Sequence, residues 1–150
     1  MITNIEEIKK NFKKNIFLNE CLAKYNWFNL GGPAGIFFKP NYKEELINFL
    51  KLIENKEKIF CLGAGSNTLI RDGGFDGVVI KLSSKFSYVN LLEDNVIEAG
   101  AATLDKKVSS FAQENELGGL EFLSCIPGSI GRSILMNSGR YGEEISQYFI

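Results

Sequence analysis

A short glycine loop carries the residue types best suited to binding an anionic ligand. Its residues are Gly63, Ala64, Gly65, Ser66 and Asn67. Two glycines in so short a loop let successive backbone N–H groups converge on one point, which creates a phosphate site without a cationic side chain. The loop lacks the third glycine of the dinucleotide-binding pattern G-x-G-x-x-G and the Gly-Lys-Ser/Thr of a P-loop. On its own it fits either a phosphate loop of another kind or an ordinary turn that ends a strand.

A second segment combines proline and glycine in the order Ile-Pro-Gly-Ser-Ile-Gly. Its candidate binding residues are Ile126, Pro127, Gly128, Ser129 and Gly131. Proline and glycine fix a backbone path that can lie close to a flat ligand, although a tight turn between strands explains the same residues. Gly100 and Ala101 follow another apolar run, and such small residues also allow a close approach of backbone to ligand.

Residues for direct acid, base or metal chemistry are scarce. The chain has no histidine, and its three cysteines, Cys21, Cys61 and Cys125, are odd in number and far apart. We expect no disulfide framework and no metal site, and we expect the cysteines to be reduced and packed in the interior. Ser124, Cys125 and Arg140 have suitable chemistry, but suitability alone does not make a residue catalytic, so we assign no catalytic residue.

The composition is that of a soluble globular protein of one domain, divided into two lobes. Of the 150 residues, 45% are hydrophobic, and 17 basic residues nearly balance 18 acidic ones. No net field favours a nucleic acid or a membrane surface, so we expect a small-molecule partner. No apolar run is long enough to span a bilayer, and the N-terminus is too charged for a signal peptide. We therefore expect a cytoplasmic protein.

The hydrophobic pattern predicts mixed helices and strands. Apolar residues at helical spacing predict a first helix around Ile5–Phe12, and a second that is capped by Asn41 and ends near Lys56. The second helix joins two buried strands, residues 36–38 and 58–62, in a β-α-β unit. Further strands are expected at 75–83, 86–92, 95–101, 133–137 and 145–150. A helix capped by Thr103 and ended by Gly118-Gly119 lies among them.

Four segments, in this order, resemble the UDP-N-acetylenolpyruvoylglucosamine reductases, the MurB family of flavoenzymes. They are NWFNLGGPAGIFFKP, CLGAGSNTLIRDGGFDGVVIKLS, GLEFLSCIPGSIG and MNSGRYGEEIS. The resemblance implies an α+β FAD-binding domain of the vanillyl-alcohol-oxidase (PCMH) type. Its first subdomain would be residues 1–82, with the N-terminal helix, and its second residues 83–150, with the flavin between them. The chain stops within an expected apolar strand, so we expect a truncated second subdomain and an absent substrate-binding domain.

The same resemblance implies the ligands and their contacts. The backbone from Gly63 to Asn67 would hold the FAD pyrophosphate, the segment Ile126–Gly131 would contact the flavin, and Gly100 and Ala101 would lie near it. NADPH would be the reductant, and UDP-N-acetylglucosamine enolpyruvate would be reduced to UDP-N-acetylmuramate for peptidoglycan synthesis. The family's catalytic residues lie in later sequence, so we expect the 150 residues alone to be inactive.

Two residues depart from the family pattern. Arg132 stands where the family has glycine, and Arg140 where it has a small residue. Such an arginine would clash with the flavin, reach solvent or contact the phosphates of the ligand. A non-catalytic flavin-binding fragment or degenerate remnant is therefore the alternative function. Another oxidoreductase of the same flavin fold is disfavoured by the combination of the last two segments.

Overall fold

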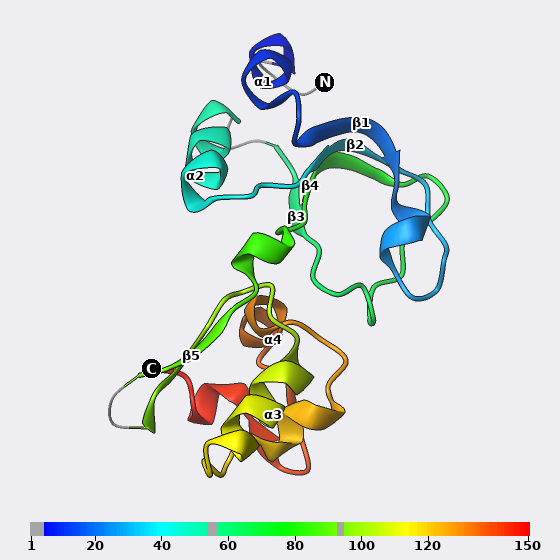
Figure 1. Ribbon diagram of the computed structural model, residues 1–150. Helices are drawn as coiled ribbons and strands as arrows, with labels where there is room; N and C mark the ends of the chain where they lie inside the picture. Colours follow the sequence, from blue (N-terminus) through cyan, green and yellow to red (C-terminus); the bar gives the residue numbers. More distant parts are fainter. Residues whose placement is uncertain (1–4, 54–56, 93–94) are drawn as a thin grey trace. The chain divides into compact units, whose positions relative to one another are not determined.

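The computed structural model describes residues 5–53, 57–92 and 95–150. The chain forms two compact units, Met1–Ser83 and Ser84–Ile150, and each contains both helices and strands (Figure 1). The predicted α+β class is confirmed. No helix in the described ranges has the length and apolar character needed to cross a membrane.

The first unit is built on a four-stranded sheet in the order β1-β2-β4-β3. Its strands are β1 (Ile16–Cys21), β2 (Pro33–Phe38), β3 (Ile59–Cys61) and β4 (Phe75–Ile80). β1 is antiparallel to β2, whereas β2 and β3 both run parallel to β4, which lies between them. The chain passes from β2 through helix α2 (Lys43–Leu52) to β3. The predicted β-α-β unit is therefore confirmed, with β4 inserted between its two strands.

Both faces of this sheet are covered, which explains why β2 and β4 are almost wholly apolar. Helices α1 (Ile5–Phe12) and α2 cover one face (Figure 1). The cluster beneath them contains Ile8, Phe12, Ile36, Phe38, Phe49, Ile53, Val78 and Ile80. Successive strand residues point to opposite faces. The other face accordingly holds a second cluster, composed of Leu22, Ala34, Phe37, Leu62 and Val79.

The second unit contains two antiparallel hairpins and several short helices. Its strands are β5 (Val89–Leu91), β6 (Ile97–Ala99), β7 (Gly139–Arg140) and β8 (Glu143–Glu144). Its helices are α3 (Asp105–Glu114) and α4 (Ile130–Met136), with 3-10 turns η2 (Ser84–Phe86), η4 (Glu121–Cys125) and η5 (Ile145–Gln147). Its core consists of Val108, Phe122, Leu123, Ile130 and Ile145.

The predicted helix caps are wrong in both units because their side chains have other partners. Asn41 donates to the side chain of Asn15, and helix α2 begins after Tyr42 without a side-chain cap. The Thr103 hydroxyl binds the backbone of Tyr88 across the unit, and Leu104 occupies the N-cap position of α3. In both cases a tertiary contact competes with a local one.

Several element boundaries also differ from the prediction. Helix α3 ends at Glu114, before the expected Gly118-Gly119 stop, and the predicted α2 end at Lys56 lies outside the described residues. The segments predicted as strands at 133–137 and 145–150 belong to helix α4 and to η5 with the following residues. The alternating residues of β1 were not recognised as a strand. The three cysteines are free, as expected, but they are exposed, so the predicted interior packing is wrong.

We predict that Phe38→Ala weakens the first unit by about 3–5 kcal/mol in free energy of unfolding. Phe38 is fully buried, its ring stacks on Phe49 at a centroid separation of 3.9 Å, and removing it leaves a cavity between sheet and helix. Urea denaturation followed by circular dichroism measures the loss. The control is Phe17→Ala, because the Phe17 ring is exposed on β1, and it should cost less than about 1.5 kcal/mol. Equal losses in the two variants would contradict the assigned core.

Candidate cofactor-binding site

The glycine loop Gly63–Asn67 lies at the carboxyl edge of the parallel strands in the first unit. It follows β3 directly, and the carboxyl ends of β2 and β4 lie at the same edge because all three strands run in one direction. Ligands of open parallel sheets bind outside this edge, since the connecting loops there are free to vary. The loop is therefore in the position where an anion site is expected.

The backbone of this loop has hydrogen-bonding capacity that the fold does not use. Within the part of the chain that the structure describes, no N–H group from Gly63 to Asn67 donates a hydrogen bond. The side chains of Ser66 and Asn67 likewise form no hydrogen bond with other described residues. A run of backbone donors needs acceptors, from solvent or from a ligand. Consecutive free N–H groups suit a multi-oxygen anion such as a pyrophosphate.

The loop is held in place by the segment that follows η1 (Leu22–Tyr25). Gly65 has φ of +76°, and a Cβ there would lie 2.1 Å from the carbonyl oxygen of Tyr25. The N–H of Trp27 donates to the carbonyl of Gly65 at 3.0 Å. Asn26, which is buried, fixes this segment by donating to the carbonyls of Leu22 and Leu30. Glycine at position 65 is thus required by the fold itself.

Further glycines bring the same two chain segments together. A Cβ on Gly32 would lie 1.9 Å from the carbonyl oxygen of Asp72, and a Cβ on Gly74 would lie 1.9 Å from that of Pro33. The carbonyl of Arg71 accepts from the N–H groups of both these glycines. Arg71 and Asp72 accordingly belong to a turn whose backbone supplies these contacts.

The aromatic pair Trp27-Phe28 is exposed, at 64% and 52% of the side-chain surface. Neither residue belongs to the two core clusters of the first unit. Trp27 enters the loop contact through its backbone, and its ring lies outside the core of this unit.

In the second unit the structure brings together two segments that are distant in sequence. Leu104 and Ser129 form an antiparallel bridge, and the Ile130 N–H donates to the Thr103 carbonyl at 2.9 Å. Beside them the Gly131 N–H donates to the Ala101 carbonyl, also at 2.9 Å. Ala101 and the loop Gly128–Gly131 are therefore joined through their backbones, and Ser129 and Ile130 are buried at the junction. Gly100 lies next to it and donates to Tyr88.

The glycines here are needed for close packing within the unit. A Cβ on Gly131 would lie 2.8 Å from the Ala101 side chain, and one on Gly100 would lie 2.2 Å from the Phe86 carbonyl oxygen. Helix α4 begins at Ile130, so Gly128 and Ser129 lead directly into its first turn. Ile126 is half-buried against the core and Pro127 is exposed.

Asp105 is a buried carboxylic acid beneath this loop, and the sequence analysis missed it. It is 0% exposed, and it accepts a hydrogen bond from the Ser133 hydroxyl at 2.6 Å. Its own N–H donates to the Gly128 carbonyl. Burial raises the pKa of Asp105 to about 6, although hydrogen bonds from Ser133 and from the Gly128 backbone partly oppose that change. The position of Asp105 in the first turn of a short amphipathic helix was the available signal, but it did not reveal the contact with residue 128.

The two residues that depart from the family pattern lie near this loop. Arg140 donates to the carbonyl of Cys125 at 3.1 Å, and its guanidinium lies over the Tyr141 ring. It therefore supports the start of the Ile126–Gly131 segment from within the same unit. Arg132 is half-buried in α4. Asn137 caps α4 in the left-handed conformation and binds Glu144 and the N–H of Ser146, so it orders the following loop.

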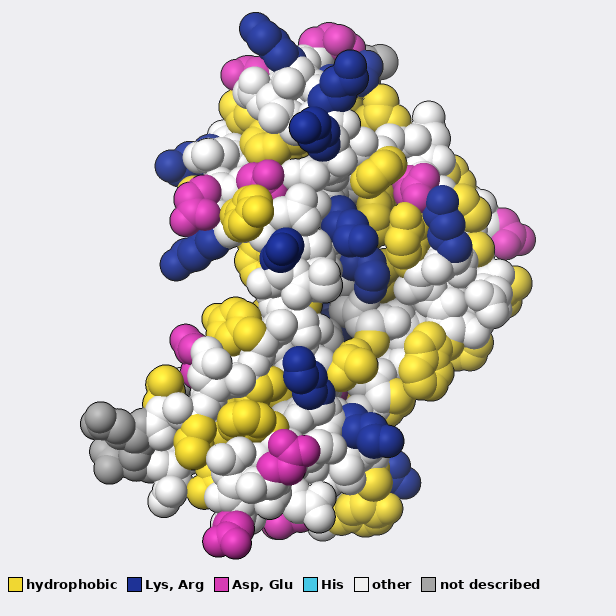
Figure 2. All heavy atoms as spheres, in the orientation of Figure 1, with side chains coloured by type: hydrophobic (Ala, Val, Ile, Leu, Met, Phe, Trp, Pro, Cys, Tyr) yellow, Lys and Arg dark blue, Asp and Glu magenta, His cyan; other side chains and the backbone are white. Residues whose placement is uncertain are grey.

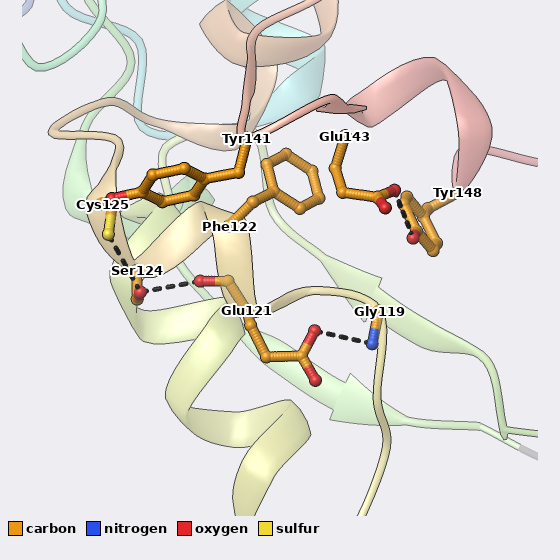
Figure 3. Close-up of a pocket in the computed structure, with 8 residues that line it drawn as sticks. All are labelled: Gly119, Glu121, Phe122, Ser124, Cys125, Tyr141, Glu143 and Tyr148. Atoms are coloured by element: carbon orange, nitrogen blue, oxygen red, sulfur yellow. Dashed lines mark hydrogen bonds between the residues drawn. The ribbon is translucent and has the colours of Figure 1, made fainter.

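A pocket of about 390 Å³ lies on the same unit, beside η4. Figure 3 shows Tyr141 and Phe122 at its centre, with Tyr148 donating to Glu143 at 2.8 Å. This hydrogen bond is the main reason that the pKa of Tyr148 is raised. The Ser124 hydroxyl donates to the backbone carbonyl of Glu121 at 2.7 Å. Ser124 is thus engaged in holding η4, and the structure assigns it no catalytic partner.

The site residues expected from the sequence fall in both units. Gly63 to Asn67 lie in the first, and the residues from Gly100 onward lie in the second. Basic and acidic side chains are interspersed on the face of the molecule in Figure 2.

Comparison with known proteins agrees with this fold. Residues 34–149 match the family described as FAD binding domain. The chain is 49% identical over 150 residues to UDP-N-acetylenolpyruvoylglucosamine reductase of Pelagibacter ubique (strain HTCC1062), covering 98% of this chain and 50% of that protein. It is 46% identical over 141 residues to the reductase of the same name from Orientia tsutsugamushi (strain Boryong), covering 92% and 44%.

A solved structure is also similar. The crystal structure of UDP-N-acetylenolpyruvylglucosamine reductase (MurB) from Thermus caldophilus aligns with a TM-score of 0.69 and 30% identity, over 87% of this chain and 44% of that one. The fold and the matched family define an FAD-binding α+β domain of the vanillyl-alcohol-oxidase (PCMH) type. The chain belongs to the MurB family, of which it represents the FAD-binding N-terminal region. It spans about half the length of the curated relatives it matches.

We predict that Gly65→Ala destabilises the first unit by about 2–4 kcal/mol, because the new Cβ meets a backbone carbonyl and the left-handed φ becomes strained. Thermal unfolding measures the effect. Gly73→Ala is the control, since no atom lies within 4 Å of a Cβ built there, and it should change stability by less than about 0.5 kcal/mol. An equally mild effect at position 65 would show that the contact with Tyr25 does not constrain the loop.

We predict that Asp105 makes stability depend on pH. Its pKa is about 6 in the folded chain and its ordinary value is 3.8, so the folded state binds more protons between these values. The contribution of Asp105 to stability is full below 3.8 and is lost as the pH rises through about 6. Relative to wild type, Asp105→Asn should therefore gain about 3 kcal/mol in unfolding free energy over this interval. Denaturation at a series of pH values measures it.

The matched control for this pH effect is Asp76→Asn, because Asp76 is exposed on β4. Its unfolding free energy should follow the wild-type pH curve. A curve for Asp105→Asn parallel to wild type would show that the buried carboxyl is not responsible.

Proposed function

We propose that the chain binds FAD and is the cofactor-binding part of an NADPH-dependent reductase that converts UDP-N-acetylglucosamine enolpyruvate to UDP-N-acetylmuramate for peptidoglycan synthesis. The observation that carries the proposal is the row of N–H groups from Gly63 to Asn67, which have no acceptor among the described residues and lie at the carboxyl edge of a parallel sheet. The similarity to reductases of this name supports the choice of ligand.

In the first unit, the pyrophosphate of FAD would accept hydrogen bonds from the backbone of Gly63, Ala64 and Gly65. Gly65 has a left-handed φ of +76°, which other residues rarely adopt and which shapes the backbone of this loop. The side chains of Ser66 and Asn67 are half-buried and exposed, respectively, and would add hydrogen bonds to phosphate oxygens. These residues fit the anionic part of the cofactor.

In the second unit, the Ala101 and Ile126–Gly131 surface would contact the flavin. Backbone hydrogen bonds join its two segments, and the buried hydrogen bond from Ser133 to Asp105 lies beneath them. These contacts make the surface rigid. Ala101, Gly128 and Gly131 are partly exposed, and their small size would let a flat ring approach the backbone there. The rigid surface reduces the ordering cost of binding.

FAD supplies the redox chemistry that the side chains of this chain lack. The residues described here would bind it, orient it and keep water from it. The remaining activity of the reductase, including substrate binding and proton transfer, would require residues beyond those of this chain, and the reaction would take place in the cytoplasm.

The alternative is a flavin-binding module without catalysis. It is favoured by the observation that the chain spans about half the length of its relatives. FAD binding is common to both proposals. Turnover of the enolpyruvyl substrate with NADPH distinguishes them: we expect none from the 150 residues alone, and turnover by them would contradict the alternative.

We predict that the purified chain binds FAD and that Asn67→Ala weakens this binding about three- to tenfold, as expected for one lost hydrogen bond to a charged acceptor. Quenching of flavin fluorescence on titration gives the affinity. Stability should be unchanged, because the Asn67 side chain is exposed and takes no part in the hydrogen bonds of the described residues.

Asn90→Ala serves as the control for the FAD titration, since Asn90 lies on β5 and binds Glu98. It should leave FAD affinity unchanged. Competition by ADP but not by adenosine would support a pyrophosphate contact. An absence of flavin binding by the folded wild-type chain would contradict the proposal.

A further inference from the structure

Two lysines extend from neighbouring strands at the edge that carries the glycine loop. Lys39 follows β2 and Lys81 follows β4. The last residues of these strands, Phe38 and Ile80, are paired in register, and the Lys81 N–H donates to the Phe38 carbonyl at 3.0 Å. The two lysines are therefore adjacent across the sheet.

The ammonium group of Lys81 contacts the loop directly. Its Nζ donates to the carbonyl oxygen of Gly63 at 2.5 Å. The residue is half-buried, and within the described ranges its ammonium group forms no ion pair with a carboxylate. Burial lowers the pKa of Lys81, and the nearby charge of Lys39 lowers it further. Two positive charges thus lie together beside a loop that has no acidic side chain.

This contact fixes the direction of one peptide group. The described chain contains no cis peptide bond, and in a trans peptide the carbonyl and the following N–H point in opposite directions. Because the Gly63 carbonyl points at Lys81, the Ala64 N–H points away from it. The same N–H is one of the donors that the fold leaves unused.

We propose that Lys81 is a positioning residue for the phosphate loop: its ammonium group holds the Gly63 carbonyl so that the Ala64 N–H is presented to an anion, and its charge, with that of Lys39, favours a pyrophosphate there. The identity of that anion rests on the proposed function. The role of Lys81 in ordering the loop does not, since it follows from contacts within the chain.

A purely structural role for Lys81 is less consistent with these contacts. A half-buried charge is costly unless it is compensated, and a single carbonyl compensates it only in part. An apolar side chain at the end of β4 would pack against the second core cluster without that cost. A phosphate close to the loop would offset the charges of both lysines, which explains why they are tolerated together.

The test uses three variants of the full 150-residue chain. Lys81→Met removes the charge and the hydrogen bond but keeps the length of the side chain. Lys81→Arg keeps the charge with a different donor geometry. Lys39→Met removes the second charge without the loop contact, because Lys39 is exposed and makes no hydrogen bond to the loop in the described structure.

The first measurement needs no ligand. We expect Lys81→Met to shift the amide resonance of Ala64 and to lower the ¹⁵N heteronuclear NOE from Gly63 to Asn67, while Lys39→Met leaves both unchanged. Circular dichroism confirms that each variant is folded. Titration with inorganic pyrophosphate and with FAD follows. We expect Lys81→Met to lose at least about tenfold in affinity, Lys39→Met less than about threefold, and Lys81→Arg an intermediate amount.

The outcomes separate this inference from the proposed function. If Lys81→Met leaves the Ala64 resonance and the loop NOE unchanged, the positioning role is overturned. This holds even if the affinity for pyrophosphate or FAD falls, because the loss then reflects only the missing positive charge. A disturbed loop in Lys81→Met together with a wild-type chain that binds neither pyrophosphate nor FAD supports the positioning role and overturns the proposed function. If Lys81→Met disturbs the loop but binds pyrophosphate and FAD with wild-type affinity, the proposal that the ordered loop binds the anion is overturned.

Discussion

Parallel pairing of β2 and β3 with β4 is the constraint on which the first unit depends. It directs three strand ends to one edge of the sheet, and it requires a crossover helix, α2, to return the chain to the start of β3. That helix and α1 bury one face, and η1 with the segment after β3 covers the other. The glycine loop therefore forms part of the covering of a buried sheet, and its shape is set by that covering.

Unused hydrogen-bonding capacity distinguishes this loop from an ordinary turn. A turn that merely reverses the chain satisfies many of its own backbone groups, whereas the N–H groups after β3 have no acceptor within the described structure. The contacts that hold the loop are made by its carbonyls, to Trp27 at one point and to Lys81 at another. Holding a loop by its acceptors leaves its donors available, which is the arrangement an anion site needs.

The sequence predicted the elements whose patterns are local and long. The amphipathic pattern of Ile5–Phe12 and the apolar runs of β2 and β4 each determine their own structure. The glycine and proline segments were also located correctly as places of unusual backbone. Local patterns could not predict the hydrogen-bond partners of the polar residues. Thr103 binds Tyr88 rather than capping a helix, and Asp105 lies beneath Gly128. The reason for Gly65, a contact with Tyr25, spans two distant segments and has no local signature.

Contacts between the backbone of residues 22–33 and that of residues 63–74 tie the glycine loop to a distant part of the chain. Each joins positions about 40 residues apart, so these contacts raise the contact order of the first unit. Topologies with many long-range contacts fold more slowly than those built from local ones, because a long loop must close before such a contact can form. The glycine loop therefore adds to the entropic cost of folding the unit that carries it.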